Sequence, residues 1–457
     1  MTSFFIQDQT RFGVRRRQRT ALLALLLSVS ACSAPAPKAG EIGAIGGFLG
    51  AAVVEEPRAA LVARDVLSAG GTAADAVTAA FFTMTVTYPV AVGLGGGGVC
   101  LYYDHRSNKT ETLDFRLAAA AAGGAIAVPG ALRGMALLHS RYGRLPWGRL
   151  VAPAESLARF GHRISRALAK RLTPQAGRLK ADASAAALFL HSDNTAPAEA
   201  ENLIQVELAS LLTRIRTRGV GDLYGGEAGQ QFLRASTAQG GAVTISDLRQ
   251  YRAVWRETDR RPIGNNVLHL PLLGPGDNLA YQLSGLLRNS AAEAGAQAFD
   301  QGDMDTAIDR GEAGIVVGDS FGSAAACVYQ MNGAFGSAAM VPSLGIFLAP
   351  GSAARWRGYP LPLLGVNEHV HQTLLATVGA GGAVGAMAAA AVSLAVMAEG
   401  KSLAQAMAAP RPPTLGNMQV GSRVQGLWCS EGIRIRPDSC QFVSDPQAFG
   451  LASFDKF

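Results

Sequence analysis

Two short motifs in this chain have residue types that could bind a ligand or a metal ion. The first is a glycine run at residues 93–98, which reads Gly-Leu-Gly-Gly-Gly-Gly. Glycine-rich nucleotide-binding motifs follow a strand and precede a helix, and the P-loop continues as Gly-Lys-Ser or Gly-Lys-Thr. Here the run precedes an apolar strand-like segment, 99–104, and lacks that continuation. The run therefore predicts a close approach of backbone to backbone or to a ligand, and not a nucleotide site.

The second motif is the pair His369 and His371, which could be two ligands of a metal site. No third ligand lies at a suitable spacing, and neither the seven histidines nor the acidic residues gather in a cluster. We interpret the pair as part of a loop. The sequence implies neither a metal ion nor an organic cofactor.

Four of the five cysteines could form disulfides if the protein is exported. Cys429 and Cys440 bracket a short polar segment, and a disulfide between them could close a hairpin loop. Cys100 and Cys327 lie in apolar, strand-like stretches, where the default is an inert buried thiol. A bridge between these two requires that their strands be neighbours, which the sequence does not decide.

The first 31 residues have the pattern of a bacterial secretory signal. They hold five arginines against one acidic residue, hence four of the seven net positive charges of the chain. The apolar run that follows, 21–31, is about half the roughly 20 residues that a membrane-spanning helix needs. It ends in Val29-Ser30-Ala31-Cys32, which resembles the lipobox of bacterial lipoproteins. We expect an exported protein held on a bacterial membrane by a lipid on Cys32 and facing the periplasm; an ordinary signal peptide with a chance cysteine is the alternative.

The rest of the composition is that of a globular protein. Of the 457 residues, 16% are charged and 49% are hydrophobic, which argues against disorder and against a coiled coil. Because most of the excess positive charge lies in the leader, we expect no nucleic-acid partner. The most apolar later stretch, 383–398, is rich in alanine and predicts a buried helix.

The periodicity along the chain predicts helices and strands in a mixed order. Helices are expected at 59–67, 72–86 and 279–287 and over most of 130–260, hairpin strands at 99–104 and 111–116, further strands at 314–319 and 324–330, and little structure at 288–310.

Segments spread over residues 43–415 match, in order, the signature stretches of a known family. They lie at 70–76, 93–98, 113–116, 128–130, 141–147, 150–154, 240–241, 247–248, 251–256, 335–337, 381–382 and 409–411. By these stretches the chain resembles the γ-glutamyltranspeptidase family of exported N-terminal-nucleophile hydrolases. The resemblance implies an α+β fold, a four-layer αββα sandwich in largely one compact domain, and self-cleavage into a large and a small subunit.

The leader pattern and this resemblance together predict a division of the chain into parts. The leader predicts a lipoprotein signal peptide at 1–31 and a tether at 32–42. The resemblance implies a large-subunit-like part at 43–305 and a small-subunit-like part at 306–425, and a C-terminal tail follows at 426–457.

The family reaction needs a threonine that autoproteolysis frees, so that its hydroxyl attacks the γ-glutamyl carbonyl and its α-amine acts as the base. Family spacing places this nucleophile at Glu312, whose side chain has no hydroxyl for the acyl shift. No Ser, Thr or Cys occurs from Ala307 to Asp319. Thr306 is the fallback nucleophile. It lies six residues upstream of Glu312, so its use would add six residues at the start of a strand whose first residue must lie at the active site.

Some positions that hold the substrate in the family are matched in this chain. By this resemblance, Arg116 is the arginine that clamps the substrate α-carboxylate, and a guanidinium suits that task because it pairs with both oxygens. Asn332 matches a substrate-binding asparagine. The amides of Gly381 and Gly382 match the pair that forms the oxyanion hole.

Other family positions are not matched. The acidic residue that receives the substrate amino group would fall near Ala354, and the serine pair falls in the segment 360–364, which has no serine. Leu117 replaces the glutamate that follows the clamp arginine. Without these groups the ammonium of an amino acid has no partner in the site.

Three hypotheses follow. The first is a degenerate family member that keeps the scaffold, has lost self-cleavage and turnover, and binds a γ-glutamyl or other carboxylate-bearing small molecule. The second is an active hydrolase or transferase of glutathione-like amides that uses Thr306. The third is a structural or interaction lipoprotein without a ligand, whose protein partner the sequence does not identify. We favour the first, because the nucleophile and the amino-group site are lost together.

Overall fold

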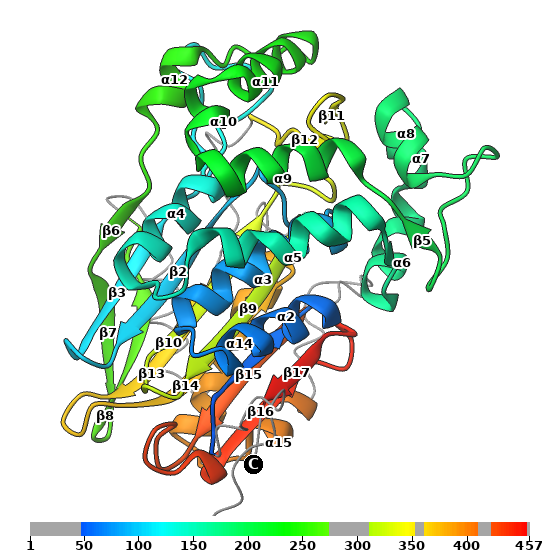
Figure 1. Ribbon diagram of the computed structural model, residues 1–457. Coiled ribbons are helices and arrows are strands. Elements are labelled where there is room, and N and C mark those ends of the chain that lie inside the picture. Colours follow the sequence, from blue (N-terminus) through cyan, green and yellow to red (C-terminus); the bar gives the residue numbers. More distant parts are fainter. Residues whose placement is uncertain (1–46, 274–309, 352–360, 410–421, 455–457) are drawn as a thin grey trace, which may run out of the picture. The chain divides into compact units, whose positions relative to one another are not determined.

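The computed structural model describes residues 47–273, 310–351, 361–409 and 422–454 (Figure 1). Residues from Phe48 onward form one compact unit. The expected leader and tether with Cys32, the expected helix at 279–287, Thr306 and Ala354 lie outside the described residues.

The first sheet has seven strands in the order β17-β1-β9-β10-β2-β3-β6, all paired antiparallel. Glu312 at the start of β9 lies opposite Gln330 of β10, and Gln330 lies opposite Gly97 of β2. The strands are β1 (Gly50–Val54), β2 (Gly97–Asp104), β3 (Lys109–Asp114), β6 (Val254–Arg256), β9 (Glu312–Asp319), β10 (Ala324–Gln330) and β17 (Leu451–Phe454).

The second sheet has six antiparallel strands in the order β16-β15-β14-β13-β8-β7. Its strands are β7 (Thr258–Ile263), β8 (Asn266–Pro271), β13 (Leu361–Asn367), β14 (Gln372–Ala380), β15 (Arg423–Cys429) and β16 (Cys440–Ser444). Strands from before and after residue 306 occur in both sheets, so the two subunit-like parts share one fold. The segment 426–457, expected as a C-terminal tail, instead completes β15 and supplies β16 and β17.

Helices cover the outer face of each sheet (Figure 1). On the first sheet they are α2 (Pro57–Ser68), α3 (Ala73–Thr87), α4 (Ala131–Tyr142), α5 (Trp147–Phe160) and α9 (Val206–Arg218), and they share one large core with it. On the second sheet α14 (Gly382–Met397) and α15 (Leu403–Ala408) form a separate core. A third core fills the space between the sheets, where Val316 of β9 and Ala376 of β14 are both buried. The layers are helix, sheet, sheet, helix, which confirms the expected αββα sandwich.

Short elements complete the part of the chain that follows α5. They are α6 (Arg166–Leu172), α7 (Ala176–Leu179), α8 (Ala183–Phe189), α10 (Gly221–Gly225), α11 (Glu227–Ala238), α12 (Ile245–Gln250), the 3-10 helices η1 (Thr173–Gln175) and η5 (Pro437–Ser439), and the strand pairs β4 (His162–Arg163) with β5 (Asn202–Leu203) and β11 (Met340–Val341) with β12 (Ile346–Phe347).

α3 is buried along its whole length and is held at its start by side chains. Thr72 caps the helix in a capping box with Asp75, and Asp319 at the end of β9 accepts a hydrogen bond of 2.8 Å from the amide of Ala73. Asp75 also accepts the amides of Arg144 and Leu145 at 2.9 and 3.1 Å. These hydrogen bonds join the start of α3 to the end of β9 and to the segment 144–145. They hold in place the helix that packs against β9 and β10.

The glycine run at 93–98 lies where main chains pass close together. A Cβ on Gly95 would lie 2.1 Å from the carbonyl oxygen of Phe347, and one on Gly98 would lie 2.4 Å from that of Val328. A side chain at either position would collide with backbone. This confirms the expectation of a close backbone approach.

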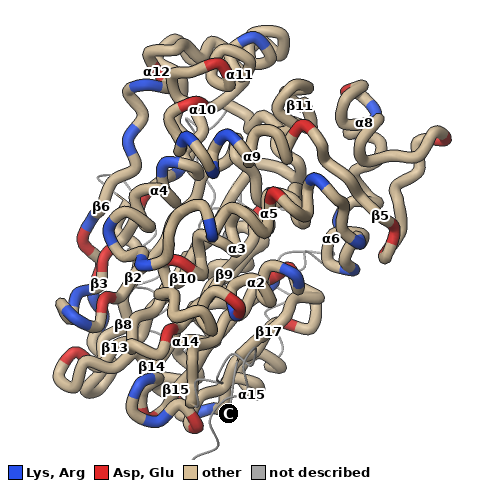
Figure 2. Tube along the Cα trace, in the orientation of Figure 1, with Lys and Arg blue, Asp and Glu red and all other residues tan. Residues whose placement is uncertain are grey.

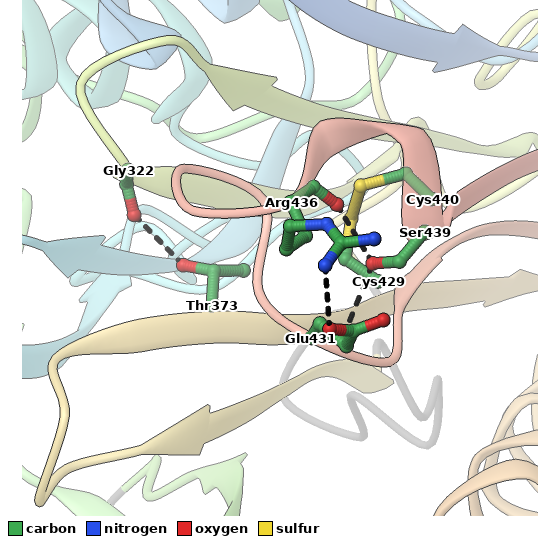
Figure 3. Close-up of a disulfide and its surroundings, with 7 residues drawn as sticks. All are labelled: Gly322, Thr373, Cys429, Glu431, Arg436, Ser439 and Cys440. Carbon is green, nitrogen blue, oxygen red and sulfur yellow. Dashed lines mark hydrogen bonds and ion pairs between the residues drawn. A yellow bond between two sulfur atoms is a disulfide. The ribbon is translucent and has the colours of Figure 1, made fainter.

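Two disulfides join neighbouring strands. Cys100 of β2 and Cys327 of β10 are directly opposite in the register and are bonded, so the expectation of inert buried thiols is wrong for this pair. The sequence could not decide this, because strand order is a long-range property. Cys429 and Cys440 are bonded where β15 and β16 meet, and Figure 3 shows the adjoining loop held by an ion pair between Arg436 and Glu431.

His369 and His371 lie in the turn between β13 and β14, as expected of a loop. In the described part of the chain, no group of three or more His, Cys, Asp or Glu side chains is arranged to hold a metal ion. None of the helices described is long and apolar enough to cross a membrane. Figure 2 shows basic and acidic residues interspersed along the trace.

Candidate active site

Glu312 is the first residue of β9, in the interior of the first sheet, and only 1% of it is exposed. The residue before it, Gly311, has a φ of +61°, and a Cβ there would lie 2.0 Å from the carbonyl oxygen of Gly333. Only glycine fits this position. The entry of the chain into β9, and with it the position of Glu312, is therefore determined closely by its surroundings.

Gly381 and Gly382 form the turn between β14 and α14, with φ values of +116° and +67°. When two successive residues have positive φ values, their backbone N–H groups can point to the same place. Such an arrangement of amides binds anions. Both amides donate to the same oxygen of Glu312, Oε2, at 3.0 Å from Gly381 and 2.6 Å from Gly382. The structure thus brings together the residue expected at the nucleophile position and the two residues expected to form the oxyanion hole.

The Glu312 carboxyl group has two unlike oxygens. Oε2 accepts the two amides, whereas Oε1 is buried and has no hydrogen-bond partner among the described residues. Burial raises the pKa of Glu312 above its usual value. The amides of Gly382 and Gly381 and the positive charges of Arg310 and Arg423 act in the opposite direction, but burial is the largest effect. The side chain is therefore a buried acid whose charged form depends on the glycine amides.

The backbone of Glu312 is held by two arginines that come from distant parts of the chain. Arg171 of α6 and Arg423 of β15 each donate to the carbonyl oxygen of Glu312 at 3.1 Å. Arg423 also forms an ion pair of 2.9 Å with Glu55, whose other oxygen accepts the amide of Gly314 at 3.0 Å. Glu55 is 0% exposed. These contacts tie β1, β9 and β15 together at the candidate site.

Arg116 follows β3 and lies at the same end of the first sheet as Glu312. A Cβ on Gly97 would lie 2.8 Å from the carbonyl carbon of Arg116, and Gly97 is linked to Glu312 through the register of β2 and β10. The guanidinium of Arg116 bonds both oxygens of Asp114 at 3.0 and 3.1 Å and the carbonyl of Leu273 at 2.9 Å. Because β10 and β2 lie between them, Arg116 is about 14 Å from the line of β9.

Asn332 follows β10 and lies beside the segment that enters β9. The amides on either side of it, from Met331 and Gly333, donate to the carbonyls of Gly311 and Arg310 at 2.9 and 2.8 Å. Asn332 itself has a φ of +56°, which asparagine tolerates better than most residues. The structure therefore places Asn332 next to the position of the expected nucleophile.

The unmatched family positions that the structure describes are apolar and buried. Leu117 is 7% exposed and lies in a small apolar cluster with Ala127 and Ala349. Leu361, Leu363 and Leu364 of β13 are 0% exposed. These positions therefore offer no side-chain polar group to a substrate.

Sequence reasoning missed Glu55, Arg171 and Arg423, the residues that hold the start of β9. The sequence shows only that Glu55 directly follows an apolar strand-like run, and its burial, which demands a partner, is known from the structure alone. No signal pointed to Arg171 or Arg423. Their role depends on contacts across 141 and 111 residues of sequence.

Comparisons with known proteins agree with this fold. The sequence model described as gamma-glutamyltranspeptidase matches residues 59–283. The glutathione hydrolase proenzyme of Pseudomonas aeruginosa is 31% identical over 267 residues, which cover 53% of this chain and 46% of that protein. The acylase ACY 1 proenzyme of a Pseudomonas species is 30% identical over 258 residues, which cover 50% of this chain and 45% of that protein. The chain thus spans somewhat under half the length of these relatives.

Among solved structures, the cephalosporin acylase from Bacillus halodurans superimposes with a TM-score of 0.74. The match covers 93% of this chain and 99% of that chain at 19% sequence identity, so it shows a shared fold. From the family match, the related glutathione hydrolase and the common four-layer fold, we conclude that this chain belongs to the γ-glutamyltranspeptidase family.

Proposed function

We propose that this protein is an exported, lipid-anchored member of the γ-glutamyltranspeptidase family that neither cleaves itself nor transfers γ-glutamyl groups. The observation that carries the proposal is the carboxylate of Glu312 on the amides of Gly381 and Gly382. In this family the residue at that position supplies the nucleophile, and amides of this kind stabilise the oxyanion of the reaction.

Two independent obstacles oppose catalysis at Glu312. Its side chain has no hydroxyl for an acyl shift, so the bond between Gly311 and Glu312 has no internal nucleophile of the required type. Its carboxyl group also occupies both amides, and a substrate carbonyl could reach them only by displacing a buried, hydrogen-bonded side chain. Either obstacle alone would suppress the parent reaction.

We further propose that the remaining function is binding without turnover. Arg116 lies at the same end of the sheet as Glu312, and its guanidinium pairs with both oxygens of Asp114, so a substrate carboxylate would have to replace part of that pairing. A γ-glutamyl compound or another carboxylate-bearing small molecule would then bind through Arg116. The membrane anchor would be the lipid on Cys32, with the folded unit in the periplasm.

The decisive experiment is the intact mass of the soluble form that lacks residues 1–32, after prolonged incubation near neutral pH. We expect a single uncleaved species, and no release of p-nitroaniline from γ-glutamyl-p-nitroanilide. The matched variants are Glu312→Thr, which supplies the hydroxyl, and Thr306→Ala, which removes the fallback nucleophile. Two fragments from the wild type, with a new N-terminus between residues 306 and 312, would overturn the proposal, and loss of that cleavage in Thr306→Ala would identify an active enzyme.

Binding without turnover is tested separately by thermal unfolding with glutathione. We expect glutathione to raise the melting temperature of the wild type and not that of Arg116→Ala, each compared with its own ligand-free value. Equal shifts in both proteins would show that Arg116 does not hold the ligand. The absence of a shift in both would favour an interaction protein without a small-molecule ligand.

A further inference from the structure

A small pocket lies behind the start of β9, on the side of the Glu312 carbonyl oxygen. Its volume is about 120 Å³, and its polar lining includes Lys170 and Arg171 of α6, Arg423 of β15, and Tyr88. We infer that this basic pocket binds a small oxyanion, a phosphate or a small carboxylate. The inference does not depend on whether Glu312 has lost catalysis.

The charge of the basic pocket favours an anion. Three cationic side chains line it, and no acidic side chain is among its described lining residues. One of these cations, Arg423, forms an ion pair with the buried carboxylate of Glu55, whereas Asp445 accepts hydrogen bonds from the amides of Val424 and Gln447. In the view of Figure 2, α6 is marked by basic positions. An oxyanion would therefore enter a pocket whose described lining carries cationic side chains and no acidic one.

Two groups at the basic pocket have hydrogen-bond donors to spare. The Lys170 ammonium forms no ion pair or hydrogen bond with the residues that the structure describes. The hydroxyl of Tyr88, which is 1% exposed, accepts from Arg171 at 3.1 Å, and its own proton has no acceptor in the described part of the chain. A buried hydroxyl proton without an acceptor is costly, and an oxyanion in the pocket would accept it.

The basic pocket is small. Its volume is about 120 Å³, which suits an ion of a few heavy atoms. The ligand class inferred for it is a small oxyanion, and not the γ-glutamyl compounds considered for Arg116.

Phe449 stands at the edge of the basic pocket in an unusual backbone conformation. Its φ is +54°, its ring is partly exposed, and the guanidinium of Arg166 lies 6.0 Å from the ring centre. A left-handed conformation in an aromatic residue is unfavourable and persists only where the surroundings impose it. Here the next residue, Gly450, is packed so tightly that a Cβ would lie 2.3 Å from the carbonyl oxygen of Val54. The ring is thus fixed at the edge of the pocket.

The basic pocket touches the candidate active site through shared arginines. Arg171 and Arg423 line the pocket and also donate to the carbonyl oxygen of Glu312. An anion in the basic pocket would therefore lie beside the two arginines that hold the first residue of β9.

The test is isothermal titration calorimetry of the soluble chain that lacks residues 1–32, with inorganic phosphate, acetate and succinate as separate probes at constant ionic strength. We expect at least one probe to bind saturably at one site per chain. Lys170→Ala should weaken that binding about tenfold, the effect of losing one charge-assisted bond. Lys180→Ala removes an equal charge from an exposed position nearby and should leave the affinity unchanged.

Tyr88→Phe is the second variant, because it removes the hydroxyl while keeping the ring and the charge of the basic pocket. We expect it to weaken binding severalfold without a change in stoichiometry. Absence of saturable binding for all three probes would overturn the inference, and so would equal weakening by Lys170→Ala and Lys180→Ala. A preference for phosphate over acetate and succinate, or the reverse, identifies which oxyanion the pocket takes.

Discussion

The carboxylate oxygen Oε2 of Glu312 lies 2.6 Å from the amide nitrogen of Gly382, in a turn that binds the same oxygen through Gly381 as well. A side chain of the protein thus occupies the two amides that, in our proposal, correspond to the oxyanion hole of the family. The two amides are satisfied without a ligand, and the start of β9 is joined to the start of α14.

The first prediction concerns the removal of this carboxylate. Glu312→Ala leaves the amides of Gly381 and Gly382 without their acceptor, which we expect to lower the free energy of unfolding by about 1–3 kcal/mol. Acetate should restore part of the loss, because it can enter the space of the deleted carboxylate. Urea denaturation with and without acetate measures both effects.

The control for this rescue is Glu312→Gln, which keeps an acceptor oxygen for the two amides and fills the space. We expect acetate to stabilise Glu312→Ala more than either the wild type or Glu312→Gln. Equal stabilisation of all three proteins would show that acetate acts elsewhere, with the basic pocket as the first place to examine.

The second prediction concerns the buried ion pair between Glu55 and Arg423. Arg423→Met leaves the carboxylate of Glu55 buried without its charged partner, and we expect a loss of about 3–5 kcal/mol in the free energy of unfolding. Removal of both charges in Glu55→Gln with Arg423→Met should cost clearly less than the sum of the single changes. A double-mutant cycle by urea denaturation measures the coupling, and strict additivity would contradict a pairwise role.

The third prediction compares the two disulfides by the length of chain each one closes. Cys100 and Cys327 are 227 residues apart, whereas Cys429 and Cys440 are 11 apart. If chain entropy of the unfolded state dominates, their contributions to stability are about 5 and about 3 kcal/mol. The paired alanine substitutions, studied by urea denaturation, test this order. A larger loss from the short loop would point instead to the role of the loop at 430–439 in the folded state.

The fourth prediction concerns acid pH. Burial, and then the charge of Arg58, lower the pKa of His162 from 6.5 to about 4. Between pH 6.5 and about pH 4, His162 is protonated in the unfolded chain and neutral in the folded chain. The free energy of unfolding is therefore unaffected by this histidine above pH 6.5 and decreases as the pH drops towards 4. The fall is roughly 3 kcal/mol. His162→Gln should remove this component from the pH dependence of unfolding, whereas His191→Gln, at an exposed position, should retain it.

Local patterns were sufficient for several features. The helix from Thr72 onward, the hairpin of β2 and β3 and the buried apolar helix after Gly382 each depend on capping, alternation or continuous apolar character within a few turns of chain. The signature stretches added the four-layer architecture. The spacing along the sequence also singled out Glu312 and the two glycines, which the structure places in contact, while their roles stay a prediction.

Contacts between distant residues were not predictable in this way. The disulfide between Cys100 and Cys327 exists because β2 and β10 are neighbours, and strand order is decided by the packing of the whole sandwich. The same holds for Arg171 and Arg423, which meet at the carbonyl of Glu312 from different ends of the chain.

The sequence by itself determined that a glutamate stands where we expect the nucleophile and that two glycines lie where we expect the oxyanion hole. Only the tertiary structure decided what that glutamate does. Burial at the start of β9 leaves its carboxylate without water, and the left-handed turn of Gly381 and Gly382 supplies amide donors in place of the lost hydration. Residue identity is local information, whereas the partner of a buried charge depends on which distant segments the fold packs against it.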